Sequence, residues 1–206
     1  MPGPAAAEPL ARERALGALT GLALGDALGM PTQSMSPAQI RRCYGEITGL
    51  RDAVAEQPIA PSVPAGSVTD DTEQALILAG LLIDGGGRID PHQLADALLR
   101  WEDDMRARGS LDLLGPSTKL ALERVRAGAD PHCTGRQGTT NGSAMRVAPV
   151  GIAFSLSADG DALARAVQAS CLVTHDTRQG FEAAGLLAAA VSAAIDGVDA
   201  AGALEA

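Results

Sequence analysis

The chain has 206 residues, a length at which one domain can bury its core without disulfide bonds. Its 16 Lys and Arg residues stand against 25 Asp and Glu residues, which gives a net charge of −9. A nucleic-acid backbone would be repelled by this charge, so we expect no nucleic-acid partner. Hydrophobic residues make up 46% of the chain but aromatic residues only 2%, and this composition favours helices and excludes a β-sandwich or barrel.

The cysteine content and the N-terminal sequence indicate a cytoplasmic protein. Cys43, Cys133 and Cys171 are odd in number and far apart, which fits unpaired thiols in a reducing compartment. The N-terminus lacks the cationic start and apolar stretch of an export signal. The apolar segment 15–27 contains Asp26 and is shorter than the roughly 20 residues of a membrane span, so we expect no membrane association.

Apolar residues recur with a helical period along the whole chain, and no stretch shows the alternation of a strand. We predict helices over 10–29, 37–44, 71–84, 91–107, 116–127, 142–157, 160–172 and 177–196. Two long segments between them, 45–68 and 128–141, are expected to be ordered loops because helices with apolar faces flank both. The prediction is an all-α bundle that forms a single domain over residues 1–206.

The first predicted helix carries Gly17, Gly21, Gly25 and Gly29 at a spacing of four, which places them along one face. Each costs about 1 kcal/mol relative to Ala inside a helix, so something should approach that face closely. The simpler interpretation is a tightly packed second helix, and the alternative is a ligand pocket at the end of this helix. Asp26 on the same apolar stretch belongs either to a structural hydrogen-bond network or to the support of a ligand-binding residue.

The sequence Thr69-Asp70-Asp71-Thr72-Glu73 directly precedes an apolar helical run. Its ordinary interpretation is a helix N-cap, with acids that complement the helix dipole. Two adjacent carboxylates beside threonine hydroxyls are also the hard oxygen ligands that Mg²⁺, Mn²⁺ or Ca²⁺ prefer. Both an N-cap and a divalent-metal half-site remain open from these residues alone.

The segment 135–143, GRQGTTNGS, leads directly into a predicted helix. Such a loop can direct backbone N–H groups at an anion, although an ordinary loop with a serine cap explains the pattern equally well. His175 lies where one predicted helix ends and the next begins, which fits a capping group or a pocket residue. His92 and His132, each next to a proline in a polar segment, give a weaker indication of function.

Taken in order, five segments resemble the ADP-ribosylglycohydrolase family. They are GALTGLALGDALGMP at 17–31, SVTDDTEQALILA at 67–79, LDLLGPSTKLAL at 111–122, TNGSAMRVAPVG at 140–151 and TH at 174–175. Their order and their spread over most of the chain make the resemblance more specific than any single motif.

The resemblance implies an all-α hydrolase with a dinuclear Mg²⁺ or Mn²⁺ site that releases ADP-ribose from an ADP-ribosylated protein or a related ADP-ribosyl small molecule. It implies that Thr69, Asp70 and Asp71 hold metal, that Asp112 is an acid near the reacting sugar, and that His175 faces the ribose. The diphosphate and ribose would be received by a set of loop residues, namely Gly138, Thr139, Thr140, Asn141, Gly142 and Ser143.

The chain departs from the family pattern at two places. Gln33 in GDALGMPTQ stands where many members have Glu, and an amide can orient substrate or water but cannot act as an anionic ligand or a base. The later family motif G-x-D-x-D-T-x-x-x-x-x-G, which supplies the other half of the metal site, has no match up to Ala206. We therefore expect a fragment or shortened form with one metal half-site. The alternatives are that another polypeptide completes the site, or that the protein is a catalytically silent ADP-ribose-binding or structural protein, as in crystallin relatives.

Overall fold

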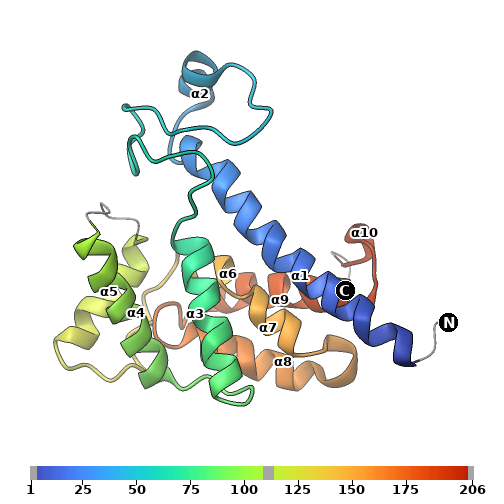
Figure 1. The fold of residues 1–206 in the computed structure, drawn as a ribbon. Coiled ribbons are helices and arrows are strands. Elements are labelled where there is room, and N and C mark those ends of the chain that lie inside the picture. The colour runs from blue at the N-terminus through green and yellow to red at the C-terminus, as the bar shows by residue number, and fades with distance from the viewer. Residues whose placement is uncertain (1–3, 109–113, 204–206) are drawn as a thin grey trace.

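The computed structural model describes residues 4–108 and 114–203, and its helices are arranged as shown in Figure 1. They are α1 (Pro4–Gly29), the 3-10 helix η1 (Met30–Thr32), α2 (Pro37–Tyr44), α3 (Asp70–Asp84), α4 (Pro91–Ala107), α5 (Pro116–Arg126), α6 (Gly142–Met145), α7 (Ala148–Ala153), α8 (Leu156–Cys171), α9 (Arg178–Asp196) and α10 (Ala200–Ala203). Every regular element in this part of the chain is a helix, so the predicted all-α fold is confirmed.

Proline marks the start of several helices. Pro37 follows the N-cap Ser36, and Pro91 follows the N-cap Asp90. Proline fits the first turn because its fixed φ is helical and its missing N–H would have no partner there. The cap of α2 is a capping box, in which the Gln39 N–H donates to Ser36 Oγ at 3.3 Å and the Ser36 N–H donates to Gln39 Oε1 at 2.8 Å.

The prediction of one helix over 142–157 is wrong, because this stretch contains α6, α7 and the first turn of α8. Pro149 has no N–H to donate to the carbonyl of Met145, so a helix begun at 142 cannot continue through it. Within α8, Asp159 has extended backbone with φ −155° and ψ 85°, and its side chain accepts the Ala162 N–H at 2.8 Å. The continuous helix thus begins at 160, as predicted.

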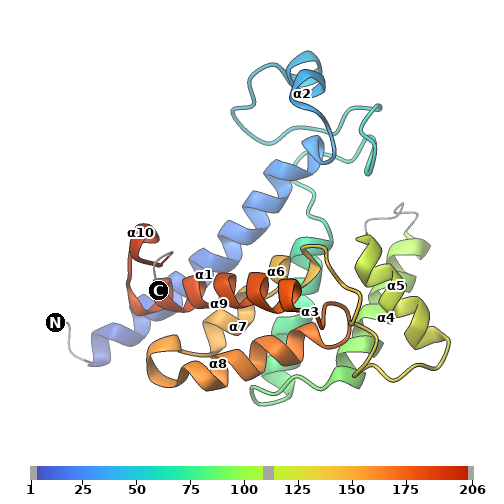
Figure 2. The ribbon, with the colours of Figure 1, turned by 180° about the vertical axis from the view of Figure 1, so that it is seen from behind.

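The core is formed where α9 packs against α6, α7 and α8, while α3 packs against α4 and α7. Figure 2 shows α9 lying across α7 and alongside α8. Aliphatic side chains fill the centre, as the composition indicates, and fully buried examples are Leu78, Leu94, Leu98, Leu122, Val147, Val150, Val167 and Val173.

The helix α1 extends beyond this core and carries α2 and the segment 45–68 at its C-terminal end, at the top of Figure 1. The segment is ordered although it contains no helix. The buried Gln57 side chain donates to the carbonyls of Met30 and Gln33, both at 3.2 Å, and its own oxygen accepts the Ile59 N–H at 2.6 Å. These bonds fix the segment against the end of α1, and the prediction of an ordered loop is confirmed.

The interpretation of the α1 glycines as a tight helix contact is wrong for the described part of the chain. A Cβ atom added at Gly17, Gly21, Gly25 or Gly29 would meet nothing within 4 Å. Three of these positions, Gly21, Gly25 and Gly29, instead line a cavity. The alternative interpretation, a pocket along the C-terminal half of this helix, is the one that the structure supports.

The cysteines are unpaired, as expected: Cys43 is half-buried, Cys133 exposed and Cys171 buried. Over residues 4–108 and 114–203, no helix combines the length and the apolar character needed to cross a membrane.

Candidate functional site

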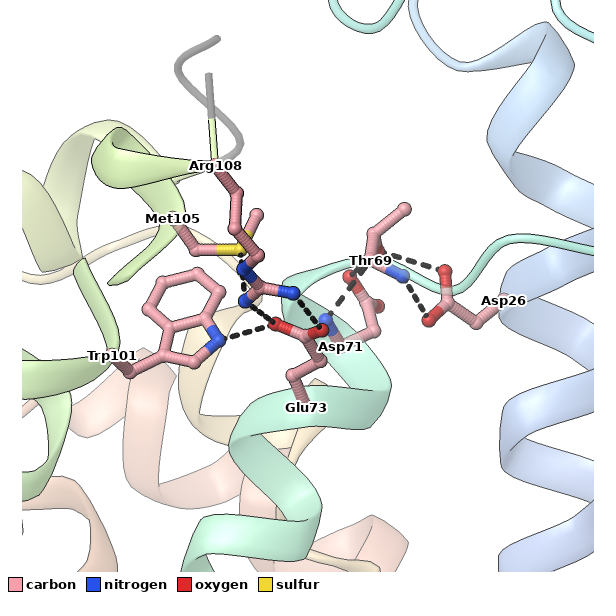
Figure 3. A network of polar contacts seen from close by, with 7 residues as sticks. All are labelled: Asp26, Thr69, Asp71, Glu73, Trp101, Met105 and Arg108. Carbon is pink, nitrogen blue, oxygen red and sulfur yellow. Dashed lines mark hydrogen bonds and ion pairs between the residues drawn. The ribbon is translucent and has the colours of Figure 1, made fainter. Parts of the chain in front are cut away.

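The N-terminus of α3 is tied to α1 through Asp26. Thr69 is the N-cap of α3, which confirms the capping interpretation. Asp26 Oδ1 accepts the Thr69 hydroxyl at 2.7 Å, and Asp26 Oδ2 accepts the backbone N–H of Thr69 at 2.8 Å, as Figure 3 shows. The same Oδ2 accepts the N–H and the hydroxyl of Thr72, at 3.2 and 2.6 Å. Asp26 is therefore a network acid that holds the start of α3 against α1.

Glu73, the third acid in the first turn of α3, turns away from the acidic pair toward α4. Its carboxylate accepts the indole N–H of Trp101 at 2.5 Å and forms an ion pair with Arg108 at 3.4 Å (Figure 3). The ion pair is partly exposed and contributes little stability. In the first turn of α3, Asp70 and Asp71 are consequently the two acids left to form a cation site.

Asp70 and Asp71 carry closely spaced negative charge at a site of low solvent exposure. Asp70 is buried, and this burial, with the nearby charges of Asp71 and Asp26, raises its pKa to about 7. Burial and the charge of Asp26 also raise the pKa of Asp71. Both shifts mean that the pair accepts protons more readily than free aspartate, so a divalent cation that neutralised the carboxylates would bind favourably.

Two cavities adjoin the acidic pair. One, of about 240 Å³, lies between Asp70, Asp71 and the first turns of α5 and α6. The other, of about 420 Å³, lies along the glycine face of α1. Both cavities are lined by Gln33, Asp71, Asn141 and Met145. Asp71 thus borders both cavities, and Gln33 borders both with it.

The donor set fits a divalent cation. Thr69 Oγ1 lies 3.3 Å from Asp71 Oδ2, close to the roughly 3 Å between adjacent oxygens of an octahedral Mg²⁺ site with bonds of 2.0–2.1 Å. The Thr69 hydroxyl donates its hydrogen to Asp26 and accepts the Asp71 N–H at 3.4 Å, which leaves one oxygen lone pair available to a cation. Thr69 and Asp71 can therefore serve as neighbouring ligands, with Asp70 beside Asp71 in the wall of the smaller cavity.

Only part of the predicted ligand loop, residues 138–143, borders the smaller cavity. The loop residues that line this cavity are Thr140, Asn141 and Gly142. The backbone N–H groups of Thr139 and Thr140 donate to Ser117 Oγ at 3.2 and 3.3 Å, so these donors already have a partner within the chain. Further back, the Gly138 N–H donates to the Gly135 carbonyl at 2.9 Å.

Ser143 also points away from the cavity, since it is fully buried and its hydroxyl donates to the Gly180 carbonyl at 2.9 Å. His175 is fully buried as well, and it lies behind Thr140 rather than on the cavity surface. Asp112 lies outside the described residues.

A directed hydrogen-bond chain connects Arg146 to the cavity. Burial and the charge of Arg146 lower the pKa of His175 to about 4, so the ring is neutral at pH 7. Arg146 donates to Thr174 Oγ1 at 2.6 Å, and Thr174 Oγ1 lies 2.8 Å from His175 Nδ1. The buried Thr174 hydroxyl is satisfied when it donates to Nδ1, which places the histidine proton on Nε2, 2.9 Å from Thr140 Oγ1.

Arg146 itself is fully buried, and burial lowers its pKa to about 10. Besides Thr174 it donates to Gln74 Oε1 at 3.0 Å and to the Ser170 carbonyl at 2.9 Å. No sequence pattern singled out this arginine, although it lies in a motif that carries the family resemblance. The start of α5, Ser117 and Thr118, was also missed; its signal is two hydroxyl residues that follow Gly-Pro at a helix N-terminus.

Gly142→Ala is expected to destabilise the protein by about 1–3 kcal/mol, because overpacking a filled site forces its neighbours to shift. A Cβ at this position would lie 2.6 Å from His175 Cε1 and 3.2 Å from Thr118 Oγ1. The ring cannot move without losing its bonds to Thr140 and Thr174. Urea denaturation measures the effect.

The matched control is Gly17→Ala, where nothing lies within 4 Å of the added atom. Alanine is the better helix former, so this variant should be up to about 1 kcal/mol more stable than the wild type. Equal stability of the two variants would contradict the close approach of His175 to Gly142.

The fold and the site define the chain as an all-α protein with a carboxylate-lined polar cavity at a helix N-terminus. Residues 7–206 match the family model for ADP-ribosylglycohydrolase, and the chain belongs to this family. It is 36% identical to the uncharacterized protein YegU of Escherichia coli K12, over 90% of this chain and 55% of that protein.

Two relatives carry names that describe an activity. The chain is 33% identical to the ADP-ribosylarginine hydrolase Tri1 of Pseudomonas putida GB-1, over 92% of this chain and 48% of that protein. It is 32% identical to the ADP-ribosyl-[dinitrogen reductase] glycohydrolase of Rhodospirillum rubrum, over 70% of this chain and 46% of that protein. The chain spans about half the length of the curated relatives it matches.

Proposed function

We propose that this protein is a divalent-metal-dependent hydrolase of the bond between ADP-ribose and an acceptor on a protein or small molecule. The observation that carries the proposal is the pair Asp70 and Asp71, fixed by the capped N-terminus of α3 in the wall of a polar cavity. Membership of the ADP-ribosylglycohydrolase family supports the reaction type. The name of one relative, ADP-ribosylarginine hydrolase, makes arginine the first acceptor to test.

In this proposal Thr69, Asp70 and Asp71 hold Mg²⁺ or Mn²⁺, with Asp26 keeping the Thr69 hydroxyl oriented. A bound ion of this kind polarises sugar hydroxyls and lowers the pKa of a bound water. Gln33 lines the same cavities and orients substrate or water through its amide, since an amide cannot take up a proton as a base. Asp112 is proposed as the acid near the sugar on the strength of the family resemblance.

In the same proposal, ADP-ribose binds against the wall of the smaller cavity that the 138–143 loop and the start of α5 form. Thr140, Asn141 and Gly142 present polar atoms there, and Thr118 adds a hydroxyl from α5. Gly138, Thr139 and Ser143 shape the loop from behind through their bonds to Gly135, Ser117 and Gly180. His175 positions the Thr140 hydroxyl and does not itself reach the ligand.

Asp71→Asn is expected to weaken Mn²⁺ binding at least tenfold, because the amide has no charge and its nitrogen cannot ligate the ion. Isothermal titration calorimetry of the wild type and the variant measures this directly. Asp84→Asn is the matched control, since Asp84 lies at the exposed far end of the same helix and should bind Mn²⁺ as the wild type does. Equal affinity for Mn²⁺ in Asp71→Asn and the wild type would contradict the assignment.

The wild type and Asp71→Asn also distinguish a hydrolase from a catalytically silent ADP-ribose-binding protein. Incubated with arginine-ADP-ribosylated protein and Mn²⁺, a hydrolase releases ADP-ribose at a rate that falls at least a hundredfold in Asp71→Asn. A silent relative binds ADP-ribose in the titration but releases none from the modified protein.

A further inference from the structure

Three side chains with metal-ligating atoms gather at the end of the molecule that lies away from the acidic pair. His92 belongs to the first turn of α4, and Asp130 and His132 come from the segment between α5 and α6. One ligand atom from each lies within 4.8 Å of the other two, and all three side chains are exposed. The imidazole rings meet edge to face with centroids 5.3 Å apart. In the described part of the chain this is the one such group of histidine, cysteine and acidic side chains.

The backbone holds these residues in place. Asp130 Oδ1 accepts the backbone N–H of His132 at 3.0 Å and lies 2.9 Å from His132 Nδ1. The Cys133 N–H donates to the Asp130 carbonyl at 2.9 Å and closes a tight turn. On the other side, Asp90 caps α4 by accepting the Gln93 N–H at 3.0 Å. Two ligands therefore lie on one closed turn and the third on a rigid helix start.

The donor set selects the class of ion. Imidazole nitrogens suit Zn²⁺, Ni²⁺ and Cu²⁺, whereas Mg²⁺ takes oxygen ligands. Zinc binds nitrogen and carboxylate oxygen at about 2.0–2.2 Å, so two ligand atoms on one ion lie at most about 4 Å apart. The ligand atoms now lie up to 4.8 Å apart, so they must move together by about 1 Å to share one ion. Exposed side chains make such a movement by rotation at little cost.

We propose that His92, Asp130 and His132 form a second metal site that binds Zn²⁺ or a similar transition-metal ion, with water completing the coordination. Asp70 is the first residue of α3, which is about 20 Å long at 1.5 Å per helical residue, and His92 follows the other end of that helix in the chain. Binding there joins the start of α4 to the segment that continues into the Gly138–Ser143 loop. Its role is structural, because it links two chain segments at a distance from the acidic pair.

The test is a calorimetric titration of tag-free protein with Zn²⁺ in excess Mg²⁺, which occupies the oxygen site. We expect one Zn²⁺ per chain, at least tenfold weaker binding in His92→Ala and in His132→Ala, and a Zn²⁺-induced rise in melting temperature that both variants lose. Asp71→Asn and Cys133→Ser are the controls and should bind Zn²⁺ as the wild type does. Because the two histidines are exposed, both variants should melt like the wild type without metal.

Unchanged Zn²⁺ affinity in the two histidine variants would overturn the proposal, as would loss of binding in Cys133→Ser, which would place the ion on the thiol. Loss of binding in Asp71→Asn would place it at the acidic pair. The outcome is independent of any hydrolase activity.

Discussion

Arg146→Ala is expected to lower the free energy of unfolding by about 3–5 kcal/mol, a large part of the stability of a domain of this size. The change removes three hydrogen bonds, to Gln74, Ser170 and Thr174, and leaves their acceptors buried. An orphaned buried polar group costs about 1–3 kcal/mol, and the cavity left by a large side chain adds to this. Relief of the desolvated charge offsets part of the loss. Urea denaturation at pH 7 measures the total.

Two further variants make this result specific. Arg146→Lys should recover only part of the stability, because one ammonium group cannot reach acceptors arranged for a guanidinium fork. Arg165→Ala, on the exposed face of α8, should change stability by less than about 0.5 kcal/mol. A loss below about 1 kcal/mol in Arg146→Ala would mean that water satisfies the three acceptors.

Asp70→Asn is expected to make the metal-free protein more stable at pH 8, while it abolishes stabilisation by Mn²⁺. The pKa of Asp70 is raised from 3.8 to about 7, so between these values the folded protein binds more protons than the unfolded chain. Stability conferred by the protonated acid is present below pH 4 and is lost as the pH rises through 7. The shift corresponds to about 4 kcal/mol, of which the variant should recover on the order of 2 kcal/mol.

Denaturation in urea with EDTA at pH 5 and pH 8 measures this effect. The wild type should be less stable at pH 8 than at pH 5, and the difference should shrink in Asp70→Asn. Asp84→Asn should keep the wild-type difference, because Asp84 is exposed. Addition of Mn²⁺ at pH 8 should stabilise the wild type and Asp84→Asn but not Asp70→Asn. The same pH dependence in all three proteins would contradict the raised pKa of Asp70.

Local patterns in the sequence predicted most of the helices because the signals of a helix start are local. Proline after Ser36 and after Asp90 marks two starts to the residue. Thr69 before two acids predicted the cap of α3, and the family motifs directed attention to the same residues. The error over 142–157 came from reading apolar periodicity through Pro149, where the chain lacks a donor.

Contacts between distant segments could not be predicted from periodicity. Nothing near Arg146 in the sequence indicates that it lies beside Gln74, 72 positions away. Neither His92 nor His132 indicates a metal site from its own surroundings in the sequence. The two histidines meet only because the segment between α5 and α6 lies beside the start of α4. The glycines of α1 show the opposite error, because their spacing suggested a close neighbour where the structure has an open cavity face.

The chain of bonds from Arg146 to Thr140 sets the polarity of the cavity wall. The guanidinium can only donate hydrogen bonds. Thr174 and His175 therefore each accept a hydrogen bond from the group before them and donate one to the group after them. With the histidine proton on Nε2, Thr140 Oγ1 accepts from His175, and its own hydrogen is free to donate into the cavity that Thr140 lines. A ligand acceptor opposite Thr140, such as a phosphate or ribose oxygen, can take this hydrogen, so the bonds behind the cavity wall keep one hydroxyl donor available to an oxygen-rich ligand.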